Sequence, residues 1–163
     1  MRKEIARFIV NGVEYEELIE SNMTLLELLR DRLGFTGTKQ GCSGSGNCGA
    51  CTVLIDGKPM LSCLTIAATV RERNITTIEG LAKGGEIHPL QKAFIEHGAV
   101  QCGYCTPGMI LAAKALLDEN SKPTRKEVQE ALAGNLCRCT GYVKIVDAVM
   151  AAAQSGSEGR EVK

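Results

Sequence analysis

The sequence predicts an α+β protein made of a strand-rich first half and a helical second half. Short apolar runs separated by Asn-Gly and Asp-Gly turns continue to about residue 79, and capped helices follow from residue 80. The eight cysteines divide into two groups of four, one in each half. A chain of 163 residues can form two small domains, and we place them at residues 1–79 and 80–163.

Strands dominate the first half. An apolar run at residues 5–10 and its return at residues 13–18 flank Asn11-Gly12, which is the preferred sequence of a two-residue type I′ turn. Three later runs also predict strands, and they cover residues 52–55, 59–63 and 75–78. The first half should therefore contain a mixed sheet that begins with a hairpin.

One helix is predicted among these strands, over residues 25–33. Thr24 and Glu27 can form a capping box at its start, leucines keep helical spacing along it, and Gly34 ends it. Mixed strands around one helix are typical of the β-grasp fold. We therefore expect residues 1–79 to form an α+β domain of this type.

Four helices are predicted in the second half. They cover residues 89–97, 107–119, 124–133 and 142–153. Thr106 is expected to cap the second helix, with Pro107 at its first position. Thr124 and Glu127 can form a capping box on the third. Four short helices predict a small bundle, and the polar residues 154–163 are expected to form a frayed tail.

The first four cysteines follow a known cluster spacing. Cys42, Cys48 and Cys51 lie in the glycine-rich stretch GCSGSGNCGAC, and Cys63 follows after eleven residues. This spacing is close to the plant-type pattern of a [2Fe–2S] cluster, which takes four thiolates. The loop must fold tightly over the cluster, and glycine permits the positive φ angles that this needs. The sequence therefore predicts a [2Fe–2S] cluster on these four cysteines.

The other four cysteines form two pairs. Cys102 and Cys105 make a C-x-x-C pair, and Cys137 and Cys139 make a C-x-C pair. Each pair comes directly before an expected helix start, where the partial positive charge of the N-terminus stabilises thiolates and a negatively charged cluster. We therefore predict a second [2Fe–2S] cluster, and all eight cysteines are then used.

Simpler interpretations remain open for these residues. A quartet of cysteines can hold zinc, and the spacing of the second quartet is closer to zinc sites than that of the first. A redox-active C-x-x-C pair is less favoured, because no thioredoxin-like βαβ pattern surrounds Cys102. His88 and His97 are expected to be surface or helix-end residues rather than metal ligands.

Charge, hydrophobicity and cysteine content exclude several classes of protein. Lys plus Arg and Asp plus Glu each number 19, so the net charge is zero and no basic field would attract nucleic acid. No signal peptide is visible, and no apolar stretch reaches the roughly 18 residues that a membrane helix needs. Eight cysteines in such a chain predict metal binding in a reducing, cytoplasmic setting rather than disulfides.

Three motifs carry a resemblance to a known family. In order, GCSGSGNCGACTV, QCGYCTPGM and GNLCRCTGY resemble the iron–sulfur subunit of the molybdenum hydroxylases. This is the xanthine dehydrogenase and aldehyde oxidoreductase family, which includes the small subunits of carbon monoxide dehydrogenase, nicotinate dehydrogenase and 4-hydroxybenzoyl-CoA reductase. The resemblance runs from the first hairpin to about Ala153 and strongly disfavours zinc in the second quartet.

The resemblance implies a fold and a set of partners. It implies a ferredoxin-like β-grasp domain followed by a four-helix domain, with an inner cluster on the second quartet, nearest the molybdopterin. The first quartet would hold the outer cluster, facing an FAD-binding medium subunit or another acceptor. Gln101 and Cys139 would contact the molybdopterin of a large partner subunit. The alternative for Gln101 is that its amide caps a local backbone group.

The chain departs from the family pattern at one point. The family usually has four residues between the first two loop cysteines, whereas this chain has five, from Ser43 to Asn47. The extra residue can bulge outward without moving the ligands. Alternatively, it changes the hydrogen bonds to the sulfur atoms and therefore the reduction potential.

Two functions fit these observations. The favoured function is the electron-transfer subunit of a larger molybdenum enzyme, with no substrate site of its own. The alternative is a free two-cluster ferredoxin-like carrier. A diffusible carrier would be expected to have a strongly charged docking face, so the net charge of zero favours the embedded subunit.

Overall fold

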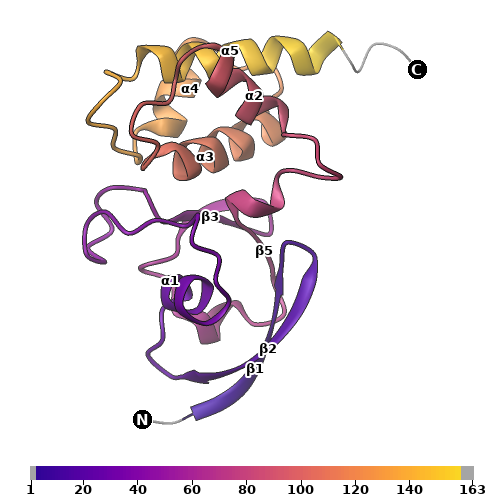
Figure 1. Cartoon of the computed structure of the whole chain (residues 1–163), viewed down its shortest axis with the longest axis vertical. Helices are drawn as coiled ribbons and strands as arrows, with labels where there is room; N and C mark the ends of the chain where they lie inside the picture. Colours follow the sequence, from indigo (N-terminus) through magenta and orange to yellow (C-terminus); the bar gives the residue numbers. More distant parts are fainter. Residues whose placement is uncertain (1–2, 159–163) are drawn as a thin grey trace.

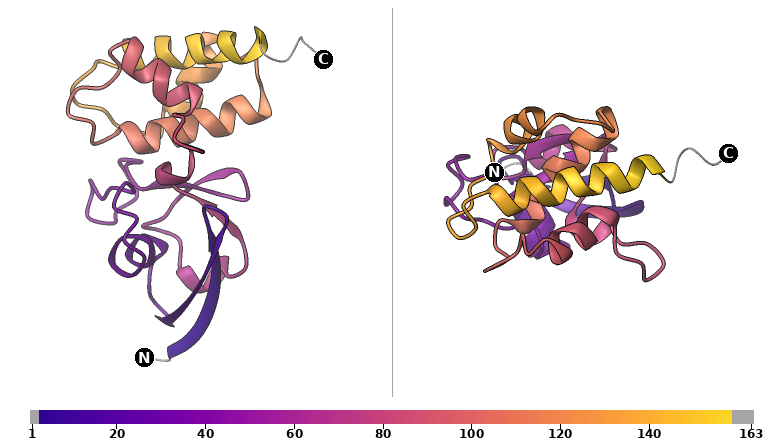
Figure 2. Two further views of the ribbon diagram at one scale, coloured as in Figure 1. Left: turned by 45° about the vertical axis from the view of Figure 1, so that its right-hand side comes forward. Right: turned by 90° about the horizontal axis from the view of Figure 1, so that it is seen from above.

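A sheet domain and a helical domain are stacked along the long axis of the molecule (Figure 1). The computed structural model describes residues 3–158. Strand β1 begins at the end of the molecule farthest from the helical domain, and the last helix lies at the opposite end, where it crosses the other helices (Figure 2). This is the α+β architecture that the sequence predicts.

The sheet has five strands. They are β1 (Lys3–Val10), β2 (Val13–Glu20), β3 (Thr52–Ile55), β4 (Lys58–Leu61) and β5 (Asn74–Thr76). Their order is β2-β1-β5-β3-β4, with β1 and β5 parallel and the other pairs antiparallel. The predicted turn Asn11-Gly12 has φ angles of 54° and 82°, as a type I′ turn requires. The hairpin predicted from this dipeptide is therefore confirmed.

The first helix differs from its prediction. One α-helical turn, α1 (Leu25–Glu27), continues as a π-helix, η1 (Leu28–Arg32). The Leu33 N–H donates to the Leu28 carbonyl at 3.0 Å, five residues earlier. The leucine spacing cannot separate these forms, because both bury the same face. Thr24 and Glu27 do form the predicted capping box. Leu25, Leu28 and Leu29 pack in the core beneath the sheet, whereas the buried Leu26 packs against Cys51 and Cys63.

Two predicted strands are shorter than expected. The strand predicted over residues 59–63 ends at Leu61, and the next residue, Ser62, donates its hydroxyl to the Cys51 carbonyl at 2.8 Å. The strand predicted over residues 75–78 ends at Thr76, because the Thr77 N–H donates to the Asn11 side chain at 2.9 Å. Two short 3₁₀-helices, η2 (Ala67–Val70) and η3 (Ile78–Gly80), were not predicted from the sequence.

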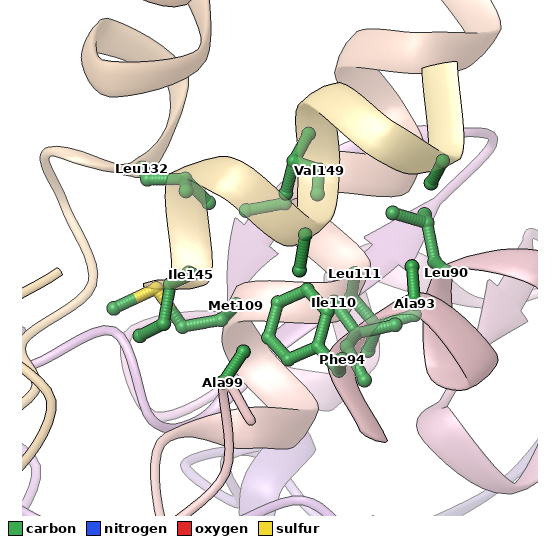
Figure 3. Close-up of a cluster of buried hydrophobic side chains, with 14 of the residues drawn as sticks. Leu90, Ala93, Phe94, Ala99, Met109, Ile110, Leu111, Leu132, Ile145 and Val149 are labelled. Atoms are coloured by element: carbon green, nitrogen blue, oxygen red, sulfur yellow. The ribbon is translucent and has the colours of Figure 1, made fainter. Parts of the chain in front are cut away.

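The helical domain contains four α-helices within the described residues. They are α2 (Pro89–Glu96), α3 (Thr106–Glu119), α4 (Arg125–Leu132) and α5 (Val143–Glu158). Their apolar faces meet in one core, in which Phe94, Met109, Ile145 and Val149 are nearly fully buried (Figure 3). The α3 helix lies against β3 and so joins this core to the sheet.

The helix ends test the capping predictions. The capping box of Thr124 with Glu127 is present on α4. The expectation for Thr106 is wrong: it is the first residue of α3, and Cys105 occupies the cap position. The tail predicted from residue 154 is also wrong in part, because α5 continues to Glu158. Residues 159–163 lie outside the described part of the chain.

His88 caps α2, and His97 ends the same helix, as expected of helix-end residues. The His88 ring nitrogen Nδ1 accepts from the Leu90 N–H at 3.2 Å, while the Gln91 side chain accepts from the His88 N–H at 2.9 Å. Burial, and then the nearby Lys114 ammonium, hold the pKa of His88 below its ordinary value. The cap therefore uses the neutral imidazole.

We predict that acid destabilises the helical domain partly through His88. Because its pKa is lower in the folded state, the unfolded chain binds a proton first as the pH falls through about 6.5. The contribution to stability is thus complete above that pH and is lost below it. In His88→Asn the amide oxygen can cap without titrating. Thermal unfolding at pH 7.5 and 5.5 should show a smaller loss in this variant than in the wild type. His97→Asn is the control and should keep the wild-type loss; equal losses in all three proteins would contradict the prediction.

Candidate metal centres

Pairing of β3 with β4 brings together Cys51 and Cys63, which are far apart in the first half of the sequence. We call Cys42, Cys48, Cys51 and Cys63 the loop quartet. Three of them lie in the loop that leads into β3, and Cys63 follows β4. In the β3–β4 ladder Thr52 is opposite Leu61, and the Ser62 N–H donates to the Cys51 carbonyl at 3.2 Å. This pairing places the ends of the loop and of β4 side by side.

The sulfur atoms of the loop quartet approach one another in pairs. The Cys42 thiol is hydrogen-bonded to Cys48, and the Cys63 thiol to Cys51. Backbone N–H groups also point at the sulfurs: those of Asn47 and Cys48 donate to the Cys42 sulfur, and that of Gly46 donates to the Cys63 sulfur. Such N–H groups stabilise the negative charge of thiolates.

Two thiols of the loop quartet, those of Cys42 and Cys63, have pKa values shifted in opposite directions. Hydrogen bonds, first from Ser45 and then from Cys48 and the Asn47 N–H, lower the pKa of Cys42 to about 6. Burial, together with the neighbouring Cys51, raises the pKa of Cys63 to about 12. A thiolate at Cys63 therefore needs a cationic partner such as iron, and metal binding there must release a proton.

The four cysteines of the helical domain also meet. We call Cys102, Cys105, Cys137 and Cys139 the helical quartet. The Cys102 and Cys139 sulfurs are 3.5 Å apart, and the Cys105 and Cys137 thiols are hydrogen-bonded to each other. In a tetrahedral site with metal–sulfur bonds of about 2.3 Å, two sulfurs lie about 3.8 Å apart. Two separate stretches of chain thus supply one group of thiols.

One half of the helical quartet is positioned by a helix and the other by a loop. Cys105 is the N-cap of α3, as the helix-terminus argument predicts. The expectation for Cys139 is wrong in part, because α5 begins only at Val143 and Tyr142 has a left-handed φ of 68°. In place of a helix end, the Thr140 hydroxyl lies 3.2 Å from the Cys137 sulfur.

Burial divides the helical quartet into an inward and an outward pair. Burial is the first cause that raises the pKa of Cys105 to about 12. Burial also opposes ionisation of Cys137, but Thr140 and backbone N–H groups outweigh it and lower the pKa of Cys137 to about 7. Cys102 and Cys139 are exposed. The exposed pair forms the side of this centre that a partner can reach.

The pairwise contacts suit a two-iron cluster. Within residues 3–158, no three His, Cys, Asp or Glu side chains are grouped so that they could hold one metal ion. The described cysteines are all free of disulfides. A [2Fe–2S] cluster takes its four thiolates two on each iron, and the N–H groups aimed at sulfur suit its negative charge. The residues present therefore fit such a cluster in each quartet.

The two quartets are joined by direct hydrogen bonds. The Leu136 N–H donates to the Cys48 carbonyl at 2.9 Å, and the buried Asn135 side chain donates to the Gly49 carbonyl at 2.8 Å. A Cβ on Gly49 would collide with the Gly134 carbonyl, so only glycine allows this approach. Asn135 was not predicted as a functional residue, although its place just before Cys137 in the GNLCRC motif was the available signal.

Gln101 lies at the exposed side of the helical quartet. Gln101 is exposed and directly precedes Cys102, which is also exposed. In the described part of the chain its side chain makes no hydrogen bond, so the local backbone cap that was the alternative is not formed. Its amide is available to a group outside this chain.

Comparison with known proteins agrees with both centres. Residues 8–75 match the family described as "2Fe-2S iron-sulfur cluster binding domain", and residues 77–150 match the "[2Fe-2S] binding domain". The nicotinate dehydrogenase small FeS subunit of Eubacterium barkeri is 52% identical over 149 residues, 91% of this chain and 94% of that protein. The aldehyde oxidoreductase of Megalodesulfovibrio gigas is 48% identical over 147 residues, which are 88% of this chain but only 16% of that protein.

A solved structure shows the same fold. In quinoline 2-oxidoreductase from Pseudomonas putida 86, a chain with 45% identity superimposes with a TM-score of 0.91, covering 98% of this chain and 99% of that one. Fold and site therefore define an iron–sulfur protein with two [2Fe–2S] clusters. The chain belongs to the small iron–sulfur subunits of the molybdenum hydroxylase family and is an electron-transfer subunit of such complexes. The alternative of a free carrier is therefore not supported.

Among residues 3–158, no helix is both long enough and apolar enough to cross a membrane.

We predict that Asn135 stabilises the contact between the two quartets. Asn135→Ala removes a buried hydrogen bond to Gly49, and such a loss typically costs about 1–3 kcal/mol. Denaturant unfolding of the cluster-loaded protein should show this decrease in the free energy of unfolding. The control is Asn22→Ala at an exposed position of the β2–α1 turn, which should change stability by less than about 0.5 kcal/mol. If the Asn135 variant were as stable as the control, the side chain would have no such role.

Proposed function

We propose that the loop quartet and the helical quartet are the ligands of the two clusters. We further propose that electrons enter from a molybdopterin on a large partner subunit through the helical quartet. They then leave through the loop quartet to an FAD-binding medium subunit or another acceptor. The observation that carries this proposal is the direct contact of the two loops, in which the Leu136 N–H donates to the Cys48 carbonyl.

The residues of this chain would hold, orient and shield the clusters. A bound [2Fe–2S] cluster accepts and releases one electron at a time. Around it, the Asn47, Cys48 and Gly46 N–H groups stabilise negative charge on the loop sulfurs. Leu136 directly precedes Cys137, so its hydrogen bond to the Cys48 carbonyl links a cysteine of one quartet to the neighbour of a cysteine of the other.

The exposed side of the helical quartet is proposed to face the molybdopterin. Gln101, Cys102 and Cys139 are exposed together there. A glutamine amide has both a donor and an acceptor, so it can match adjacent acceptor and donor atoms of a pterin ring. In this proposal Gln101 and Cys139 hold the cofactor at a fixed position beside the cluster.

Further assignments follow from the same proposal. We place the division between the cluster domains at residues 79 and 80, within η3, close to where the two family matches divide. We assign no substrate site to this chain, because substrate chemistry would take place on the molybdenum-bearing partner. The free cysteines fit a reducing, cytoplasmic setting.

Removal of one cluster at a time tests the order of transfer. Cys48→Ala should remove the cluster of the loop quartet, and Cys102→Ala that of the helical quartet. In the assembled complex reduced by substrate, the Cys48 variant should still reduce the helical cluster but no longer pass electrons to the acceptor. The Cys102 variant should leave the loop cluster oxidised. Rapid-freeze EPR measures both. A loop cluster reduced at the normal rate in the Cys102 variant would overturn the proposed order.

A second prediction concerns Gln101. Gln101→Ala should leave both clusters assembled but lower the molybdopterin content of the complex or slow reduction of the helical cluster. Loss of one such hydrogen bond costs about 1–3 kcal/mol, equivalent to a roughly 5- to 150-fold weaker cofactor affinity. Gln40→Ala, the same change at an exposed position beside the loop quartet, should behave as the wild type. Wild-type cofactor content and reduction rate in the Gln101 variant would remove Gln101 from the site.

A further inference from the structure

A threonine hydroxyl lies against one sulfur of the helical quartet. The Thr140 Oγ1 is 3.2 Å from the Cys137 sulfur, in a partly buried contact between residues three positions apart. Within residues 3–158, this sulfur is the one hydrogen-bond acceptor that the hydroxyl has. The short turn from Cys137 to Thr140 therefore places a polar hydrogen beside a sulfur of this quartet.

The direction of this hydrogen bond depends on the state of the sulfur. Between a thiol and a hydroxyl either atom can be the donor, because each carries one hydrogen. A cysteine that binds a metal does so as a thiolate, which has no hydrogen to donate. With Cys137 as a ligand, the Thr140 hydroxyl is therefore the donor and the sulfur is the acceptor.

Tyr142 holds both partners of this contact. Its backbone N–H donates to the Thr140 Oγ1 at 3.2 Å, which leaves the single hydroxyl hydrogen free for the sulfur. Its side-chain hydroxyl accepts from the Cys137 N–H at 3.0 Å. The φ of Tyr142 is 68°, a left-handed value that is rare for a bulky residue. The three residues thus form a closed ring of hydrogen bonds around one cysteine.

We propose that the Thr140 hydroxyl donates to the Cys137 sulfur in the cluster-loaded protein and thereby raises the reduction potential of the helical cluster. The inference rests on the proposed ligand role of Cys137. An added electron increases the negative charge on the sulfur, so the hydrogen bond is stronger in the reduced state. Hydrogen bonds to the sulfurs are among the factors that set such potentials. The proton stays on the Thr140 oxygen, and no covalent bond is formed or broken.

The position of this donor suits the proposed direction of electron transfer. Cys137 belongs to the inward pair of the helical quartet, and its neighbour Leu136 donates to the Cys48 carbonyl of the loop quartet. A higher potential of the helical cluster favours the arrival of an electron from outside the chain. It also lessens the driving force for the next step to the loop cluster. Thr140 therefore sets the balance between the two steps.

The first test is a redox titration of the cluster-loaded protein followed by EPR. Thr140→Val replaces the hydroxyl with a methyl group and should lower the midpoint potential of the helical cluster, while the loop cluster serves as an unchanged internal reference. Thr140→Ser keeps the hydroxyl and should retain the wild-type potential. The matched control is Thr106→Val, because Thr106 adjoins Cys105 of the same quartet but its side chain makes no hydrogen bond in the described residues. An unchanged potential in Thr140→Val, or an equal decrease in Thr106→Val, would overturn the proposal.

The second test begins with the wild-type protein, so it does not depend on the folding of a variant. Electron–nuclear double resonance of the reduced helical cluster in H₂O and D₂O should detect an exchangeable proton coupled to the cluster, and its absence would refute the hydrogen bond. The same proton should be missing from Thr140→Val and present in Thr140→Ser. Cys137→Ala tests the ligand assignment separately, since it should abolish the signal of the helical cluster. A surviving signal would contradict the proposed ligand set rather than the role of Thr140 alone.

Discussion

The structure depends on the close approach of one glycine backbone to the helical domain. Gly49 has a φ of 69° and lies between two cysteines of the loop quartet. A Cβ at this position would collide with the Gly134 carbonyl, and the Gly49 carbonyl accepts from the Asn135 side chain at 2.8 Å. Gly108 of α3 has a similarly short approach to the Gly49 carbonyl. The spacing of the two domains is thus set by backbone groups rather than by long side chains, which have many rotamers.

This contact joins the two cysteine quartets into one structural unit. The segment that carries Asn135 and Leu136 leads directly into Cys137, and its partners are Gly49 and Cys48 of the other quartet. A displacement of one domain would therefore disturb the cysteine-bearing loops of both. The Tyr104 hydroxyl adds a bond to the Gln40 carbonyl at 2.7 Å, next to the loop quartet. Electron transfer between two clusters requires a constant distance between them, and the hydrogen bonds to the backbone carbonyls would keep that distance fixed.

Local signals in the sequence predicted most of the fold and both cysteine groups. Asn11-Gly12 predicted the hairpin, and Thr124 with Glu127 predicted the start of α4, because turns and caps depend on residues a few positions apart. The π-helical turn at Leu28–Arg32 was not predictable, since leucine spacing fits either helix type. The role of Asn135 depends on a partner 86 residues away.

The related proteins share much of this sequence although their names refer to different substrates. Enzymes named for nicotinate, aldehyde and quinoline contain chains or segments that are 45–52% identical to it. Such similarity between enzymes with differently named substrates is expected if the shared residues serve the clusters and their spacing. In the aldehyde oxidoreductase the matching part is 16% of a longer protein, whereas in the Eubacterium barkeri protein it is 94% of a separate subunit. The same unit therefore occurs both as a separate subunit and as part of a longer chain, which agrees with cysteine quartets that are brought together by contacts within the unit itself.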